Sequence, residues 1–453
     1  MQLINRSISN KADKNNHLVE KLALAATALL GAGAHSQDYV KDAADLASEW
    51  NIAASSLLYS EIDRVSAAEF IISGNKDFHD TGNFDFKIVL DTLTGSSPNG
   101  AIEQNTAQTF TRPSGGEEGE ITIQQYTIGA NTTPLDDAFQ DLRVQSSFNW
   151  IDSFSEDYRY SMGGNFSKEL DYTSVSANLG LEKDLFQKNT TLSIGFSGGS
   201  DSYEPTAGIP DPMQPMLFRR DFSSRSRFTR AFKATRGNLS GSISTSEVLL
   251  GWTQVVSRRM LTQFNLGISN SSGYLNDPFK VISLLNTQGA VQEYIYEGRP
   301  DQRTKKTFFA LTKYHLEESV FDLSYRYMTD DWNIQSHTFD THWLFFTDSG
   351  DFWQPHFRFY HQSAADFYTP FLVQGNPVPT YATSDYRVGE MDAVTLGLKY
   401  GMQLANNHRF EMRLEYYTQS PIKANQPTGI ANLDGLDLYP KVNAIIFQMS
   451  YYL

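Results

Sequence analysis

The chain has 453 residues, no cysteine and a formal net charge of −15 at pH 7. The lack of cysteine excludes disulfides, thiolate metal sites, covalent c-type haem and a lipoprotein anchor. The acidic balance argues against a nucleic-acid partner, because nucleic acids select basic surfaces.

The first 34 residues have the layout of an export signal. Lysines precede the apolar run 22–33, which ends in small residues that fit an A-x-A cleavage site. The run is too short to cross ~30 Å of hydrocarbon as a helix. We expect residues 1–34 to be a cleaved signal peptide, residues 35–50 to form a short periplasmic segment with a helix, and residues 51–453 to form one domain.

Beyond residue 34 no stretch of the sequence approaches the ~18 continuous apolar residues that a transmembrane helix needs. Apolar and polar residues instead alternate with a period of two, which predicts strands. Many of these strands are long enough to cross a membrane at a tilt. They are predicted at 51–61, 64–73, 84–94, 141–152, 156–167, 171–184, 189–203, 244–257, 259–274, 304–316, 319–332, 337–348, 352–366, 387–404, 407–420 and 441–453.

The connections between these strands alternate between short and long. Short turns on one side and long loops on the other are typical of outer-membrane barrels, and an even strand count puts both chain ends in the periplasm. About 16 strands fit this parity, while 14 and 18 remain open, since strand ends are the least certain part of such a prediction. The long connections are predicted at 95–140, 204–243, 276–303, 367–386 and 420–440.

The faces of the strands distinguish a membrane barrel from a soluble sandwich. In strand 407–420, Met412, Leu414 and Tyr416 alternate with charged residues, which require a wet interior. The last strand, 441–453, has an apolar face up to the final residue, as a strand that closes a barrel does. The sequence therefore predicts an all-β fold, a transmembrane antiparallel β-barrel with long outer loops and short periplasmic turns.

Charged residues that share the inner faces of neighbouring strands are the candidate site. A turn at Ser349–Gly350 places position 342 nearly opposite 357, and 340 opposite 359. Imidazole and carboxylate groups there suit zinc or copper or a proton-linked gate. Because the spacing fixes no third ligand, we favour a charge ladder and predict no metal. The lumen candidates are Arg326, Asp340, His342, His356, Arg358, Glu411, Arg413 and Glu415.

The sequence gives little support to catalysis. It contains neither an H-E-x-x-H zinc motif nor a G-x-S-x-G nucleophile elbow. We predict that the protein is not an enzyme. A hydrolase with Ser/His or Asp/His pairs on barrel strands remains the open alternative.

Several strings together resemble a family of uncharacterised proteobacterial proteins, a domain of unknown function predicted to form outer-membrane barrels. The resemblance spans nearly the whole mature chain and implies location and fold. It also implies that members are encoded near periplasmic flavin transferases and small lipoproteins, as in an envelope redox system. The strings begin at Asp91, Thr106, Thr133, Gly164, Gly273, Gly298 and Asp330.

The resemblance gives the run Asp91–Ser97 a second interpretation. Its letters D-T-L-T-G-S-S are similar to the covalent flavin attachment motif D-x-x-[ST]-G-A-[ST], in which the last hydroxyl carries the flavin. Ser97 is the acceptor on this interpretation, but Ser96 replaces the alanine of the motif. A strand that ends in a Gly/Ser/Pro turn explains the same residues. We expect no cofactor, with covalent flavin as the alternative.

These observations predict a porin-like channel for small solutes or ions in the outer membrane of a Gram-negative cell. One alternative is a non-conducting barrel that scaffolds or docks an envelope redox or secretion component. Another is a fatty-acid-type transporter, although residues 35–50 are short for an N-terminal hatch. The expected partners are outer-membrane lipids, the barrel assembly machinery and a small lipoprotein or periplasmic redox protein.

Overall fold

The computed structural model describes residues 50–62, 64–78, 82–112, 123–405, 408–422, 430, 433, 438 and 441–453. The predicted signal peptide lies outside the described residues, and so does the predicted periplasmic segment except for Trp50. Within the described part of the chain, no helix has both the length and the apolar character to span a bilayer.

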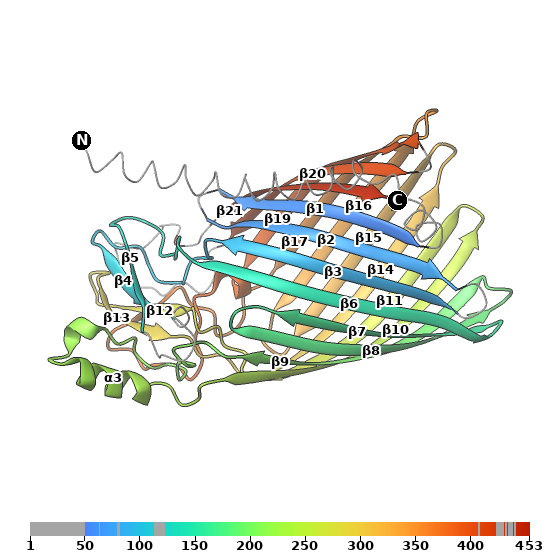
Figure 1. Cartoon of the computed structure of the whole chain (residues 1–453). Coiled ribbons are helices and arrows are strands. Elements are labelled where there is room, and N and C mark those ends of the chain that lie inside the picture. The colour runs from blue at the N-terminus through green and yellow to red at the C-terminus, as the bar shows by residue number, and fades with distance from the viewer. Residues whose placement is uncertain are drawn as a thin grey trace, which may run out of the picture.

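Sixteen strands close into a barrel in which every neighbouring pair is antiparallel (Figure 1). The last strand pairs with the first over nine residues, from Ala53 opposite Tyr452 to Glu61 opposite Ala444. The predicted strand count and the predicted closure are therefore confirmed. The barrel strands are β1 Asn51–Glu61, β2 Ser66–Asp77, β3 Asn83–Thr94, β6 Gln140–Ser155, β7 Tyr158–Lys168, β8 Tyr172–Leu185, β9 Thr190–Tyr203, β10 Gly241–Ser257, β11 Met260–Gly273, β14 Gln302–His315, β15 Ser319–Asp330, β16 Gln335–Phe346, β17 Phe352–Gln362, β19 Met391–Gln403, β20 Arg409–Pro421 and β21 Val442–Tyr452.

All long connections lie at one end of the barrel, together with the short connections 62–65, 169–171 and 331–334, and the connections at the other end are all short. We call the end with only short connections the turn end, where Leu453 also lies, and the other the loop end (right and left in Figure 1). Two predicted strands were too long at the loop end. β17 ends at Gln362 instead of residue 366, and β19 begins at Met391 instead of residue 387. The over-predicted residues, 363–366 and 387–390, belong to the loops, so the alternation of apolar and polar residues there did not indicate a strand.

The outer surface of the barrel is an apolar belt. Outward side chains such as Leu179, Leu266, Leu414 and Ile445 are each more than half exposed. Such residues recur on strands around the whole circumference, which is far more than the surface of a soluble protein carries. Aromatic pairs lie near the turn end, for example Trp353 and Tyr400 with ring centroids 4.4 Å apart. An apolar band with aromatic residues at its border is the surface that lipid requires.

The loops at the loop end pack into a small structure of their own, which we call the loop cap (95–112, 123–139, 204–240, 274–301 and 363–390). The sequence interpretation placed residues 274, 363–366 and 387–390 in strands and treated nearly all the rest as loops. They contain a two-stranded sheet, a three-stranded sheet and short helices (Figure 1). The elements are β4 Gln108–Thr111, β5 Gln125–Ile128, β12 Val281–Leu285, β13 Val291–Tyr296, β18 Phe371–Val373, η1 Arg219–Asp221, α3 Arg225–Ala234 and η2 Tyr386–Val388.

The loop cap has the dry core that the barrel lacks. Leu285 and Phe371 are fully buried, and Phe110 packs on Tyr294 with ring centroids 4.8 Å apart. The cap also contacts the barrel mouth, because the side-chain amide of Gln362 in β17 donates to the carbonyl of Gly389 over 2.7 Å. The protein therefore combines a barrel with a polar interior and a compact cap at one end.

Candidate functional site

All eight predicted lumen residues lie on inward faces, on β15, β16, β17 and β20. The alternation is clear in β20, where Leu414 is 55% exposed to the outside whereas Glu411 and Glu415 are buried on the inner face. We call the inner face of β15, β16, β17, β19 and β20 the charged wall. The period of two therefore placed these residues correctly.

The register of the β16–β17 hairpin differs from the prediction by one residue. His342 lies opposite His356, and Asp340 lies opposite Arg358. The predicted turn had two residues, but the Thr347 amide bonds to the Asp351 carbonyl, which leaves three residues in the turn. The third, Gly350, has φ +87°, a conformation that glycine adopts without strain. The extra residue shifts the register and brings the two histidines together.

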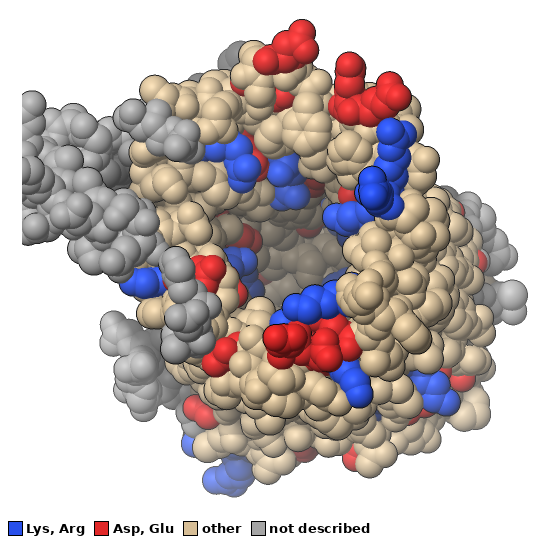
Figure 2. All heavy atoms as spheres, turned by 90° about the vertical axis from the view of Figure 1, so that its right-hand side faces the viewer, with Lys and Arg blue, Asp and Glu red and all other residues tan. Residues whose placement is uncertain are grey.

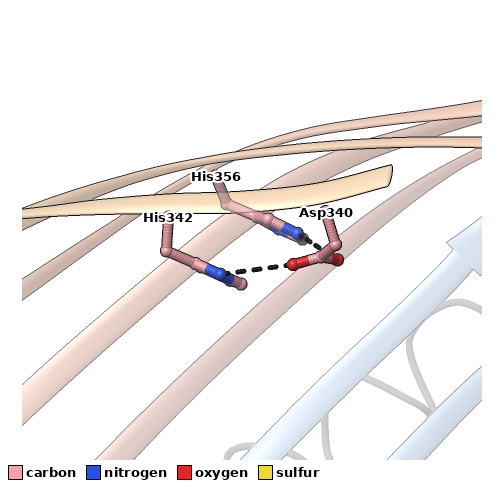
Figure 3. A group of neighbouring side chains, drawn as sticks. All are labelled: Asp340, His342 and His356. Carbon is pink, nitrogen blue, oxygen red and sulfur yellow. Dashed lines mark hydrogen bonds and ion pairs between the residues drawn. The ribbon is translucent and has the colours of Figure 1, made fainter. Parts of the chain in front are cut away.

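The two histidines belong to a continuous chain of imidazoles and carboxylates. His342 Nδ1 lies 3.2 Å from Asp322 and 3.3 Å from Asp340. His356 Nε2 lies 3.2 Å from Asp340, and its Nδ1 lies 2.9 Å from Glu415. The side chains of Asp340, His342 and His356 converge from the hairpin (Figure 3). The sequence interpretation did not name Asp322 as a candidate, although the residue alternates with apolar neighbours in its strand.

A second group of charges lies on the same wall, nearer the turn end. Glu411 accepts a hydrogen bond from Lys399 Nζ at 3.0 Å and pairs with Arg409 at 2.9 Å. Arg413 lies 3.7 Å from Glu415 and so joins this group to the histidines. The sequence interpretation missed Lys399, which alternates with Leu398 and Tyr400 and was recognisable from that alternation. A cavity of about 210 Å³ lies against both groups.

The opposite side of the lumen, formed by β6 to β11, carries mostly small residues. Gly163 lies between Asn149 and Asn178, and Gly180 pairs with Gly195 on the next strand. We call this inner face the small wall. Seen from the turn end, the barrel is hollow, with acidic and basic side chains around the opening (Figure 2). The small wall has fewer large side chains, although Arg159 pairs there with Glu182 and Asp184, so both walls carry charge.

A second set of charges lies inside the loop cap. Arg299 bonds to Glu297 at 2.9 Å and to Asp385 at 2.7 Å, and Arg387 bonds to Asp385 at 2.7 Å. These pairs join two loops that are far apart in sequence. We call the set the loop ion cluster, and its six members are Asp277, Lys280, Glu297, Arg299, Asp385 and Arg387.

Burial shapes the protonation of this cluster. Burial lowers the pKa of Lys280 and raises the pKa of Glu297. At Asp277 and Asp385 burial acts in the same raising direction, but the positive charges of Arg387 and Lys280 outweigh it and lower the pKa of both carboxyl groups. Glu297, Arg299 and Asp385 form the buried centre of the cluster, whereas Arg387 lies at its edge and is half exposed.

Ser97, the predicted flavin acceptor, lies at the edge of the loop ion cluster. Its hydroxyl accepts a hydrogen bond from Lys280 Nζ over 2.8 Å, and the same ammonium donates to the Pro98 carbonyl over 2.6 Å. A neighbouring cavity of about 250 Å³ is also lined by Tyr126 and Phe139. These contacts give the Gly/Ser turn a structural role. The absence of a cofactor stays a prediction, with covalent flavin at Ser97 as the alternative, and the intact mass of the mature protein checks it.

The described histidines have partners of two kinds. Those of the charged wall contact carboxylates, as does His361, which bonds to Asp392 at 2.8 Å. His337 and His408 instead contact tyrosine hydroxyls. Among the described residues, one group of three potential metal ligands has its ligand atoms within 4.8 Å of one another, and it consists of Asp340, His342 and His356. The third ligand that the sequence spacing did not fix is thus Asp340 itself, whose carboxylate contacts both rings.

Comparison with known proteins places the chain in a family. A model of a family of proteins of unknown function (DUF3570) matches residues 19–453. The chain belongs to this family. No curated protein sequence matches the chain. The expected membership of a family of unknown function is therefore confirmed, while the proteobacterial origin and the flavin-transferase neighbourhood stay predictions.

Solved structures with a similar fold include outer-membrane proteins. A double variant of OccD1 (OprD) has 8% identity and a TM-score of 0.39, with 89% of this chain and 95% of that chain covered. OccK5 (OpdH) of Pseudomonas aeruginosa also has 8% identity and a TM-score of 0.39, with 89% and 97% covered. A bacterial polysaccharide outer membrane secretin has 8% identity and a TM-score of 0.40, with 90% and 99% covered.

Proposed function

We propose that the protein is a channel for small polar solutes or ions in the outer membrane of a Gram-negative cell. The observation that carries the proposal is a hollow barrel of sixteen strands, whose inside is polar and charged and whose outside is an apolar belt (Figure 2). Barrels of 16 to 18 strands leave an aqueous channel instead of a filled interior.

The two walls of the lumen support different parts of this function. Charged side chains such as Arg358 and Arg413 remain partly exposed to the interior, where rings of charge set the ion selectivity of pores. The small wall leaves the cross-section open. We therefore expect the charged wall to govern selectivity and the small wall to govern the size of the conductance.

Single-channel recording in a planar bilayer tests the proposal. We expect stable open steps from the purified chain, and a smaller step size for Asn178→Trp, because Asn178 lies on the small wall and borders the interior cavity. Leu179→Trp is the matched control, since Leu179 is 60% exposed on the lipid side and should leave the step size unchanged. Absence of steps from a folded barrel would contradict the channel.

The loop cap favours a second candidate, a non-conducting barrel that docks another envelope protein. The cap is a packed structure with a dry core at the loop end, so it offers a rigid surface and restricts that end of the barrel. This candidate is supported if the native protein shows no conductance and co-purifies with another envelope component. Conductance of the native protein by itself argues for the channel.

A further inference from the structure

The geometry points to a divalent transition-metal site on the charged wall, held by His342, His356 and Asp340. The rings of the two histidines are stacked with centroids 4.2 Å apart and an angle of 4° between their planes. Both rings and the carboxylate project from the same hairpin toward one point (Figure 3). This inference goes beyond the proposed channel, because metal binding does not require that the lumen conducts.

The spacing of the ligand atoms suits one ion. His342 Nδ1 lies 3.3 Å from one oxygen of Asp340, and His356 Nε2 lies 3.2 Å from the other. Ligands that bind zinc at 2.0 to 2.2 Å in a tetrahedron are themselves about 3.3 to 3.5 Å apart. Because the two rings are parallel and stacked, at least one ring must tilt out of the stack before both nitrogens can face a single ion. The ion then replaces the hydrogen bonds that now join the three groups.

The surroundings of these ligands have the features of an outer shell. A metal-bound histidine usually donates its second ring N–H to a carboxylate, which fixes the ring and raises its basicity. His356 has this arrangement, because its Nδ1 contacts Glu415 at 2.9 Å and the Glu415 side chain is only 8% exposed. Asp322 contacts His342 Nδ1 at 3.2 Å and so also helps to orient this ring.

The donor set selects the class of metal. Two imidazole nitrogens with a carboxylate suit zinc, copper, nickel or iron, whereas calcium and magnesium prefer oxygen ligands alone. Three positive side chains lie close by, with Lys313 at 3.9 Å from Asp322, Arg358 at 4.0 Å from Asp340 and Arg413 at 3.7 Å from Glu415. They weaken the binding of a cation, so we expect reversible binding instead of a permanently occupied structural site.

The test is a metal titration of the full chain, folded in detergent micelles, purified without a histidine tag and freed of metal with a chelator. We expect one equivalent of Cu²⁺ or Zn²⁺ by isothermal calorimetry, and an electron paramagnetic resonance signal in which Cu²⁺ couples to two nitrogens. His342→Ala and His356→Ala should each remove one nitrogen and weaken binding at least tenfold. Glu415→Gln should weaken binding about 10- to 100-fold while both nitrogens remain.

His361→Ala is the matched control. His361 lies on the same strand as His356 but on the opposite face, where it pairs with Asp392. This variant should bind metal like the unchanged chain, and the heat-dependent gel mobility of each variant shows that the barrel has folded. The inference is overturned if the His342→Ala/His356→Ala double variant binds as the unchanged chain does. It is also overturned if His361→Ala loses binding equally, or if the unchanged chain binds neither ion and the rings serve proton exchange alone.

Discussion

The charged wall and the loop cap use the same ion pairs in opposite surroundings. On the wall, the side chains of Arg358 and Arg413 are 49% and 36% exposed and face a water-filled interior. In the cap, Arg299 is 9% exposed and Asp385 is 1% exposed. The Coulomb attraction between two charges is several times stronger where little water is present. A buried charge that loses its partner, however, is left without hydration and destabilises the fold.

This difference determines which charged residues can be replaced without a large loss of stability. Arg358 on the wall can be replaced at less cost in stability, because its partner Asp340 is 22% exposed and stays partly solvated. A charge in the cap cannot be replaced in this way, since the remaining partner would be buried alone. Changes of selectivity are therefore accessible on the wall, whereas the cap charges hold the loops in place.

The largest expected effect concerns the centre of the loop ion cluster. Asp385→Asn leaves Arg299 and Arg387 without their shared carboxylate, and we expect a loss of about 3 to 5 kcal/mol in the stability of the cap. Hydrogen exchange of the loop amides in the folded barrel measures this loss. Asp221→Asn is the control, because Asp221 is an exposed cap residue and its loss should cost less than about 0.5 kcal/mol. Equal effects would refute the contrast.

The next effect concerns the lipid-facing side of the barrel. Leu414→Arg places a charge near the middle of the lipid-facing side of β20 and should cost about 2 to 4 kcal/mol of barrel stability. Gln448→Arg places the same charge on the inner face of the neighbouring strand, where it meets water, and should cost far less. Reversible unfolding of the barrel in lipid vesicles measures both. If the two variants cost the same, the assignment of inside and outside is wrong.

Acid should loosen the cap before the barrel. The pKa values of Asp277 and Asp385 are lowered in the folded cap. Both carboxylates therefore stabilise the cap at a pH above their unfolded pKa, which is near 3.9. This stabilisation is lost as the pH falls through the lower pKa of the folded state. The raised pKa of Glu297 acts in the opposite direction and reduces the effect. Limited proteolysis should cut the loops faster below about pH 4, and Asp385→Asn should show a smaller change with pH.

The smallest effect is expected on the charged wall. Lys399→Gln removes the 3.0 Å contact with Glu411, yet Arg409 and lumen water remain near that carboxylate. The loss in barrel stability should stay below about 1 kcal/mol, measured by the same vesicle unfolding assay. The reversal potential of the channel should nevertheless move toward greater cation preference. A loss of several kcal/mol would show that this part of the lumen is dry.

The barrel was predictable from the sequence because its strands obey a local rule. One face meets lipid and the other meets water, so each strand shows its period of two without reference to its neighbours. The number of strands and the faces of their residues followed from this rule, whereas the ends of β17 and β19 did not. The register at His342 did not, because it depends on a three-residue turn at Gly350 that the alternation does not reveal.

The loop cap was not predictable, because its residues do not follow such a local rule. Its core is formed by contacts between distant loops, such as Lys280 with Ser97, 183 residues apart, and a buried core of this kind leaves no simple period. One element of the cap, helix α3, was recognisable from its local sequence. Ser224 caps helix α3, and Phe228 and Phe232 lie four residues apart on its buried face.

The seam between β1 and β21 has a consequence for the order of assembly. Ser55 and Ser450 bond across it at 2.8 Å although 395 residues separate them. No partner for β1 on that side exists until nearly the whole chain has been synthesised and exported. Until then two strand edges carry open hydrogen-bonding groups that invite pairing with other chains, and contacts so distant in sequence form slowly. The time before this closure is therefore when the chain is most exposed to aggregation.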